Sequence, residues 1–276
     1  MNVKLALVQM EIVQGDPKVN LEKAEHYVAQ AAKKKANIVA FPEDFLTGPV
    51  GKEGEDLVDF EGKYTKLFSK LAQKNRVDVV TGSWIEGSRH GWRNVSHYID
   101  CSGKIKGVYH KVNLWIPERT YLTAGNTTSV FHTRFGKVGL SICWDLDFPE
   151  FYRALVRRGA RLVFCPSYWV SKDAGIGLKW NEQAEIETVN ALCSARAAEN
   201  SIVLSYINGA GAFHFEGREP DPLIGQTQVT VPFRGCTARL DTNTEQMLVS
   251  EIDMSILKDA DKAYRLRDDL KQGLVQ

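Results

Sequence analysis

The sequence predicts an α/β protein in which two mixed β-sheets stack face to face between outer helices, an α-β-β-α four-layer sandwich. Three observations lead to this prediction: strand-like apolar runs alternate with amphipathic helical periods, hairpin patterns add antiparallel strands, and one helix–strand pattern occurs twice. That pattern, a basic helix end, a turn, a strand and a proline, occupies residues 34–42 and 157–166. Two equivalent units are expected to stack with their helices outside, although such patterns also arise independently in α/β proteins.

The first part of the chain follows the order βαβαβ. Apolar residues recur at helical spacing after Asn20, a residue type that favours helix N-caps, and continuous apolar runs mark the strands. The predicted elements are a strand at 3–9, a helix that Asn20 caps and that runs to 32, a strand at 37–41, a helix around 64–71 and a strand at 77–83.

Hairpins and a second set of helices follow. Residues 95–99 and 105–109 flank a turn, as do 130–133 and 138–143, so the sheets contain antiparallel strands. Further predicted elements are a helix starting near Pro149, a strand at 161–165, a helix at 180–200, a strand at 201–207 and short strands near Val229, Ala238 and Leu248. Because no Pro/Gly/Ser-rich linker divides the chain, we expect one domain over residues 1–276, with 256–276 as a charged C-terminal tail.

Composition excludes several classes of function. The 276 residues carry 35 basic and 34 acidic side chains, a net charge of +1, which leaves no excess positive charge for nucleic acid or an anionic membrane. The N-terminal apolar run at 3–10 is interrupted by polar residues and is shorter than the roughly 20 residues of a membrane span. No signal-peptide pattern precedes it, so we expect a cytoplasmic protein.

The cysteines and histidines predict neither disulfides nor a metal site. The five cysteines are odd in number and form no C-x-x-C pair, and the six histidines form no H-x-x-x-H or H-E-x-x-H pattern. We therefore expect free thiols and no metal or other cofactor.

Three polar residues stand where apolar strands stop: Glu43, Lys111 and Cys143. Ligand crevices form at strand ends in open α/β sheets. Each residue alone has an ordinary structural explanation, as a cap or salt-bridge partner, a solvated lysine and a core cysteine. Together they supply a base, a cation and a nucleophile, which suffices for covalent attack on an amide-like carbon.

The segments around these residues resemble the nitrilase superfamily, the carbon-nitrogen hydrolases. Residues 139–150 (GLSICWDLDFPE) resemble its nucleophile motif, 41–43 (FPE) its general-base segment and 111–118 (KVNLWIPE) its lysine segment. Residues 195–200, 208–209 and 224–227 follow in the family's order. The resemblance covers residues 3–255, nearly the whole chain.

The resemblance implies the α-β-β-α fold and a catalytic triad of Glu43, Lys111 and Cys143. A fourth catalytic residue of the family, seven positions beyond the lysine, matches Glu118 (118 minus 111 is 7), which would orient the lysine or hold the substrate amide. The alternative to a catalytic role is that Glu118 is a surface glutamate beside Arg119.

The pocket is expected to involve Trp144, Tyr168 and Trp169 as substrate-binding residues, with plain core packing as the alternative. Two positions depart from many amidases of the family: Asn113 stands where those enzymes carry histidine, and Tyr168 where smaller residues are common. Both departures weaken any substrate analogy with those amidases.

The implied reaction is hydrolysis of a non-peptide C–N bond through a cysteine thioester, releasing ammonia or an amine. Asp145 follows the Cys-Trp pair, as in many amidases and carbamoyl hydrolases, whereas true nitrilases tend to carry glutamate there. We expect a small amide or N-carbamoyl substrate; the alternatives are conversion of a nitrile to an acid, and a non-catalytic binding protein of the same fold. By analogy with the family, we also expect a homodimer or higher homo-oligomer.

Overall fold

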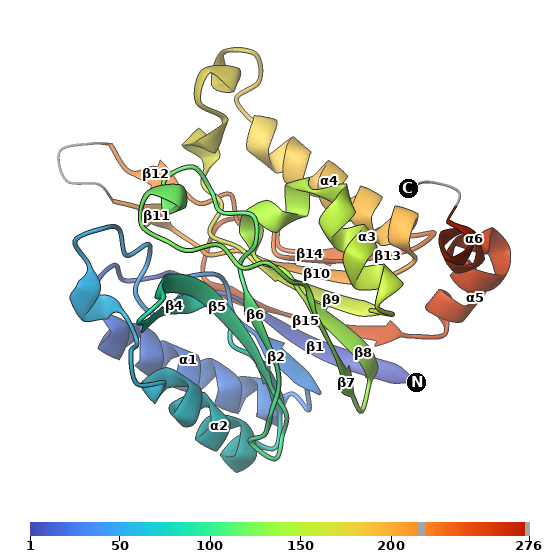
Figure 1. The fold of residues 1–276 in the computed structure, drawn as a ribbon, viewed down its shortest axis with the longest axis horizontal. Helices are drawn as coiled ribbons and strands as arrows, with labels where there is room; N and C mark the ends of the chain where they lie inside the picture. The colour runs from blue at the N-terminus through green and yellow to red at the C-terminus, as the bar shows by residue number, and fades with distance from the viewer. Residues whose placement is uncertain (215–218, 274–276) are drawn as a thin grey trace.

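The computed structural model describes residues 1–214 and 219–273 and contains two mixed β-sheets stacked face to face, each with helices on its outer side (Figure 1). This arrangement confirms the predicted α-β-β-α sandwich. The packing follows from the sequence, because strands of continuous apolar residues bury both faces and need helices outside them.

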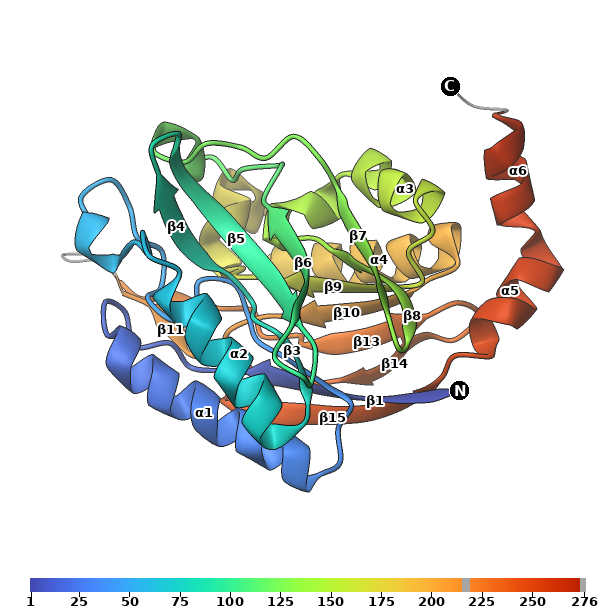
Figure 2. The same ribbon diagram turned by 60° about the horizontal axis from the view of Figure 1, so that its bottom comes forward.

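The first sheet has seven strands in the order β15-β1-β2-β3-β5-β4, with β6 paired to β5. Strands β1, β2 and β3 run parallel, and α1 and α2 cover their outer face (Figure 2). The elements of this half are β1 (Asn2–Gln9), α1 (Pro17–Lys33), β2 (Ile38–Ala40), η1 (Glu55–Leu57), α2 (Lys63–Asn75), β3 (Asp78–Val80), β4 (Trp84–Ser88), β5 (Gly91–Ile99), β6 (Ile105–His110), η2 (Glu118–Thr120) and β15 (Gln246–Asp253).

The second sheet has six strands in the order β14-β13-β10-β9-β8-β7. Strands β8, β9 and β10 run parallel, and α3 and α4 lie on the outer side of the sheet (Figure 1). Its elements are β7 (Ser129–Thr133), β8 (Gly136–Leu140), η3 (Cys143–Asp147), α3 (Pro149–Arg157), β9 (Leu162–Pro166), η4 (Ser171–Lys179), α4 (Ala184–Asn200), β10 (Val203–Ile207), β13 (Gln228–Val231) and β14 (Gly235–Arg239); β11 (Ala212–Phe213) and β12 (Asp221–Pro222) form a separate pair.

The repeated sequence pattern occupies equivalent places in the two sheets. Residues 34–42 follow the end of α1 and contain strand β2, which pairs in parallel with β1 and β3. Residues 157–166 contain the end of α3 and strand β9, which pairs in parallel with β8 and β10. Each pattern therefore forms the middle strand of a parallel trio.

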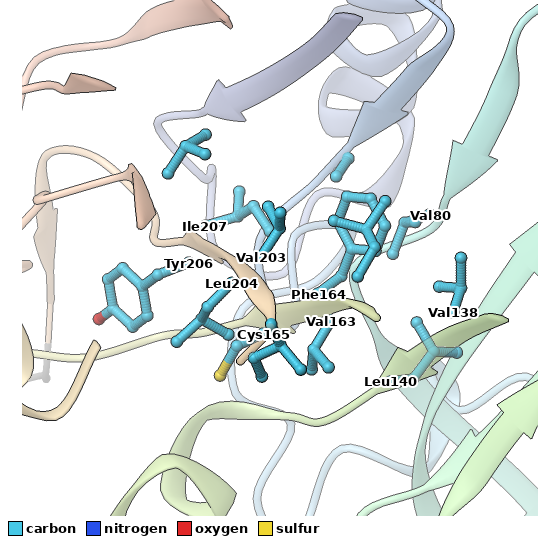
Figure 3. Packing of buried hydrophobic residues seen from close by; sticks show 14 of the residues in the cluster. Val80, Val138, Leu140, Val163, Phe164, Cys165, Val203, Leu204, Tyr206 and Ile207 are labelled. Carbon is cyan, nitrogen blue, oxygen red and sulfur yellow. The ribbon is translucent and has the colours of Figure 1, made fainter. Parts of the chain in front are cut away.

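The main apolar core includes side chains of both sheets and of the helices that cover the second one. Figure 3 shows Val138 and Leu140 of β8 near Val163 and Phe164 of β9, with Val80 of the first sheet beside them. These side chains are completely buried. Burying a residue of this size contributes about 1.5–3 kcal/mol, so the stacked sheets form a rigid support for the loops at their ends.

Two predicted helix starts were wrong. The first helix begins at Pro17 with Asp16 as its N-cap, whose side chain accepts a hydrogen bond from the Val19 N–H. Proline suits the first helical position because its fixed φ matches a helix and the missing N–H would be unpaired there. Asn20 instead lies buried inside the helix, where its side chain donates to the Val13 and Leu46 carbonyls.

The long helix predicted at 180–200 begins at Ala184, since the chain before it forms η4, which is kinked at Gly175. The hairpin of β4 and β5 includes Trp84–Ser88, which the sequence did not mark as a strand.

The C-terminal segment forms helices α5 (Ile256–Tyr264) and α6 (Leu266–Gln272), which Figure 2 shows at one end of the molecule. Leu257 and Ala260 are buried, and Asp261 forms salt bridges with Arg161 and Arg267. Within residues 1–214 and 219–273, no helix combines the length and apolar character needed to cross a membrane.

Candidate active site

Glu43, Lys111 and Cys143, which the sequence singled out, lie at the ends of strands in both sheets. Glu43 follows β2 and Lys111 follows β6 in the first sheet, whereas Cys143 follows β8 in the second. The exposed fractions of the three residues are only 3%, 2% and 8%. Stacking the sheets therefore brings a carboxyl, an ammonium and a thiol from distant parts of the sequence into one buried site.

The Lys111 ammonium binds two carboxylates. Its Nζ lies 2.8 Å from Glu43 Oε1 and 2.7 Å from Glu118 Oε2. Burial by itself lowers the pKa of Lys111, but the charges of Glu118 and Glu43 outweigh it and raise this pKa well above its ordinary value. Lys111 is thus a fixed positive charge, and Glu118 is a buried partner of the lysine rather than a surface residue.

Asn94 of β5 connects the two carboxylates, and the sequence did not mark it. Its Nδ2 donates to Glu43 Oε1 at 2.9 Å and to Glu118 Oε1 at 3.1 Å. Glu118 Oε2 also accepts the Trp115 N–H at 2.7 Å. An asparagine within a strand has no distinctive spacing, so only the pairing of strands reveals this role.

The Glu43 carboxyl lies between Lys111 and the Cys143 thiol. Besides the lysine and Asn94, it accepts the Tyr168 N–H at 2.9 Å through Oε2 and interacts with the Cys143 thiol. Burial raises the pKa of Glu43, with Lys111 opposing this effect and Glu118 adding to it, and the net shift is upward. A carboxyl with a raised pKa is suited to accept and return a proton near neutral pH.

Cys143 occupies a sharp turn between β8 and η3. Its φ of +45° is unusual for a residue other than glycine and marks a strained turn of the kind found at functional sites. Burial and the Glu43 charge raise the pKa of the Cys143 thiol well above its ordinary value, although Lys111 opposes them. The Cys143 thiol is therefore neutral at rest, and its sulfur would need a base in order to act as a nucleophile.

Asp145 links the turn at Cys143 to the segment that follows Lys111. Its Oδ2 accepts the Ile142 N–H at 2.9 Å and the Tyr109 hydroxyl at 2.6 Å, and its Oδ1 accepts both N–H groups of Asn113. The Tyr109 hydroxyl in turn accepts the Val112 N–H. Asn113, a departure from many amidases, is thus engaged with Asp145. The sequence marked Asp145 only as an indicator of substrate class.

The three residues predicted to bind substrate lie close together. The ring of Trp144, which is partly exposed, lies 4.6 Å from that of Trp115 and 5.8 Å from that of Trp169, between centroids. Trp169 is only 2% exposed and donates a hydrogen bond to Glu185. Tyr168 is partly exposed and packs edge-on against Phe213. These contacts are compatible with a pocket wall and with core packing alike.

Comparison with known proteins extends over nearly the whole chain. The family model for carbon-nitrogen hydrolases matches residues 4–262. A probable nitrilase of Schizosaccharomyces pombe is 29% identical over 96% of this chain and 93% of its own. The 2-oxoglutaramate amidase of Bacillus subtilis is 25% identical over 98% of each chain, and the N-carbamoylputrescine amidase of Arabidopsis thaliana is 26% identical over 95% of this chain and 90% of its own.

Solved structures agree on the fold. A carbon-nitrogen hydrolase from Helicobacter pylori superimposes with a TM-score of 0.86 at 23% identity, covering 97% of this chain and 94% of that one. At this level of identity, the structural similarity establishes a shared arrangement of strands and helices and does not establish a shared function.

Proposed function

Since the chain belongs to the carbon-nitrogen hydrolase family, we propose that it hydrolyses the C–N bond of a small amide or N-carbamoyl compound through a thioester on Cys143. The observation that carries this proposal is a single buried carboxyl, Glu43, which pairs with the Lys111 ammonium at 2.8 Å and interacts with the Cys143 thiol. This proximity supports the assignment of Glu43 as base, Lys111 as cation and Cys143 as nucleophile.

In the first half-reaction, Glu43 takes the thiol proton as the Cys143 sulfur attacks the carbonyl carbon and forms the S–C bond. The carbonyl oxygen becomes negatively charged in the tetrahedral intermediate. Glu43 then gives the proton to the nitrogen, the C–N bond breaks, and ammonia or an amine leaves. The product of this half-reaction is a thioester on Cys143.

In the second half-reaction, Glu43 takes a proton from water, whose oxygen attacks the thioester carbon. The S–C bond breaks, the sulfur recovers its proton from Glu43, and the acid leaves. The same carboxyl thus works alternately as base and acid, which its raised pKa favours.

The negative oxygen needs hydrogen-bond donors, and Lys111 has one to offer. An ammonium has three N–H groups, and the described contacts of Lys111 Nζ with carboxylates use two, toward Glu43 and Glu118. We assign the third N–H and the Trp144 backbone N–H to the oxyanion. One such donor contributes about 3–4 kcal/mol to the stability of the transition state.

The similarity to 2-oxoglutaramate amidase and N-carbamoylputrescine amidase supports an amide or N-carbamoyl substrate. The similarity to a probable nitrilase supports a second candidate, conversion of a nitrile to its acid, by the same three residues. Ammonia release from a matched amide and nitrile separates the two candidates, because the proposed preference predicts faster release from the amide.

Mass spectrometry of the intact protein tests the proposal. The protein is incubated with amides, N-carbamoyl compounds and nitriles, and we expect an acyl adduct on Cys143 together with turnover. Cys143→Ala should abolish the adduct and lower turnover by at least about 10⁴-fold. Cys236→Ala, which removes a partly exposed thiol, is the control and should keep both. An adduct on Cys165 or Cys193 instead would overturn the assignment.

A further inference from the structure

A second acidic side chain, Asp44, lies beside the catalytic carboxyl and takes no part in the proposed reaction. It is only 5% exposed, and its Oδ1 is buried without a hydrogen-bond partner among the described residues. Leaving a buried carboxyl oxygen unpaired costs folding free energy. The presence of a carboxyl group that destabilises the fold in this way is more readily explained by a role in ligand binding than by a role in folding.

The structural explanations for an aspartate at this position do not hold. Asp44 adopts a left-handed φ of +49°, a conformation that aspartate tolerates because its side chain can bond to the local backbone. Here the backbone makes the contacts alone: the N–H donates to Ser83 Oγ at 3.2 Å, and the carbonyl accepts the Thr47 and Gly48 N–H groups. The carboxyl makes none of the hydrogen bonds that hold this turn.

The surroundings of Asp44 have an excess of negative charge. The charged groups that act on its carboxyl are Glu43, Glu118 and Lys111. The lysine already pairs with both glutamates, so it cannot also neutralise Asp44. One ammonium thus faces three carboxyl groups, and an incoming cation would replace the proton that burial otherwise keeps on Asp44.

Two aromatic residues lie within range of the same carboxyl. The Asp44 charge contributes to raising the pKa of Tyr121 and of Tyr168, in both cases after burial itself. Both tyrosines are partly exposed. The charges of Asp221 and Glu43 also raise the pKa of Tyr168. The nearby Lys172 is engaged with the backbone, because its Nζ donates to the Glu219 and Pro220 carbonyls. Backbone contacts place both tyrosines at the same site, because the Tyr168 N–H donates to Glu43 Oε2 and the Tyr121 N–H donates to the Glu118 carbonyl. Aromatic residues close to an acid can bind organic cations.

We propose that Asp44 determines substrate selectivity by binding an ammonium or guanidinium group of the substrate beside Tyr121 and Tyr168. This inference rests on the proposed function, because it concerns the substrate of the same site. It narrows the substrate class from small amides and N-carbamoyl compounds in general to those that carry a positive charge close to the scissile carbon.

The test uses N-alkylureas and carboxamides that end in a primary ammonium, and matched compounds that end in a methyl group, over a range of chain lengths. Binding to the Cys143→Ala protein is measured by titration calorimetry. We expect the best cationic compound to bind at least about tenfold more tightly than its neutral partner, and Asp44→Asn to remove most of that difference. Asp259→Asn, which removes an exposed acid on α5, is the control and should retain the preference.

Equal or tighter binding of the neutral compounds would overturn the inference, as would a cation preference that survives Asp44→Asn. Thermal unfolding of each variant shows that a lost preference does not come from a lost fold. Hydrolysis is measured separately with Cys143 intact. An Asp44-dependent preference in binding without hydrolysis would refute the proposed function while leaving this inference standing.

Discussion

Asp145 accepts hydrogen bonds from both the backbone and the side-chain N–H groups of Asn113, at 3.0 and 2.9 Å. Asp145 stands two residues after Cys143, and Asn113 two residues after Lys111. The pair therefore joins the turn that carries the nucleophile to the segment that carries the cation, although 32 positions separate them in the sequence. The relative placement of thiol and ammonium depends on this contact.

Asp145→Asn should lower kcat about 10- to 100-fold with a smaller change in KM. The two carboxylate oxygens of Asp145 accept hydrogen bonds from four N–H or O–H donors, whereas an asparagine amide offers only one acceptor oxygen. Loss of these buried hydrogen bonds should also lower the free energy of unfolding by about 1–3 kcal/mol. Steady-state kinetics and urea unfolding measure both effects. Asp147→Asn, at an exposed position in the same turn, is the matched control. Unchanged kcat would show that Asp145 does not position the site.

Glu43→Gln should lower kcat about 10²- to 10⁴-fold, because glutamine cannot take the thiol proton. Glutamine still offers an oxygen to Lys111 and Asn94, so the fold should persist, as circular dichroism can verify. Rapid-mixing mass spectrometry should show slower formation of the Cys143 adduct. The exposed Glu55→Gln variant serves for comparison. Adduct formation at the wild-type rate would assign the base to another residue.

The pH dependence of kcat/KM should show an acidic limb that belongs to Glu43. The base acts only when deprotonated, so activity falls as the pH drops through its pKa, which burial raises above the ordinary 4.5. On the alkaline side, the pKa of Lys111 lies well above 10.5, so the lysine should cause no loss of activity up to about pH 9. A midpoint at or below 4.5 for the acidic limb would contradict this assignment.

Glu118→Gln should weaken the hold on Lys111. Removing one of two carboxylates from a buried ammonium should lower the free energy of unfolding by about 1–3 kcal/mol, less than for a fully broken pair because Glu43 remains. The pKa of Lys111 should fall toward its ordinary value, which brings an alkaline loss of kcat into the measurable range. Urea unfolding and the pH profile report the two effects. An unaltered alkaline profile would indicate that Glu118 holds the substrate rather than the lysine.

Asp44→Asn should stabilise the folded protein at neutral pH. Burial and the charges of Glu43 and Glu118 raise the pKa of Asp44 well above 3.8, so the folded state retains a proton that the unfolded state releases. The stability of the wild type therefore falls as the pH rises from about 3.8 toward that raised pKa, by at most about 1.4 kcal/mol per pH unit. Urea unfolding at pH 5 and pH 8 should show a larger gain for the variant at pH 8. A gain that does not grow with pH would mean that Asp44 is not buried in this way.

Much of the architecture could be predicted because its determinants are local. Strands such as Leu162–Pro166 are continuous apolar runs, and Pro149 at the start of α3 combines a fixed φ with a missing N–H. Asn20 misled the prediction because its preference for caps is local, whereas its hydrogen bond to the Leu46 carbonyl depends on a chain segment 26 residues away.

By itself, the sequence determined the fold class and named Glu43, Lys111 and Cys143, since each residue type follows an apolar strand and stands within a recognisable motif. Only the tertiary structure decided in which direction the pKa of Glu43 shifts, because burial and the Lys111 ammonium act on it in opposite directions. It likewise decided which groups Asn94 and Asp145 contact and that an oxygen of Asp44 is buried without a partner among the described residues. The physical reason is that charge interactions and desolvation depend on distances in space, which the stacking of two sheets sets and the order of residues does not.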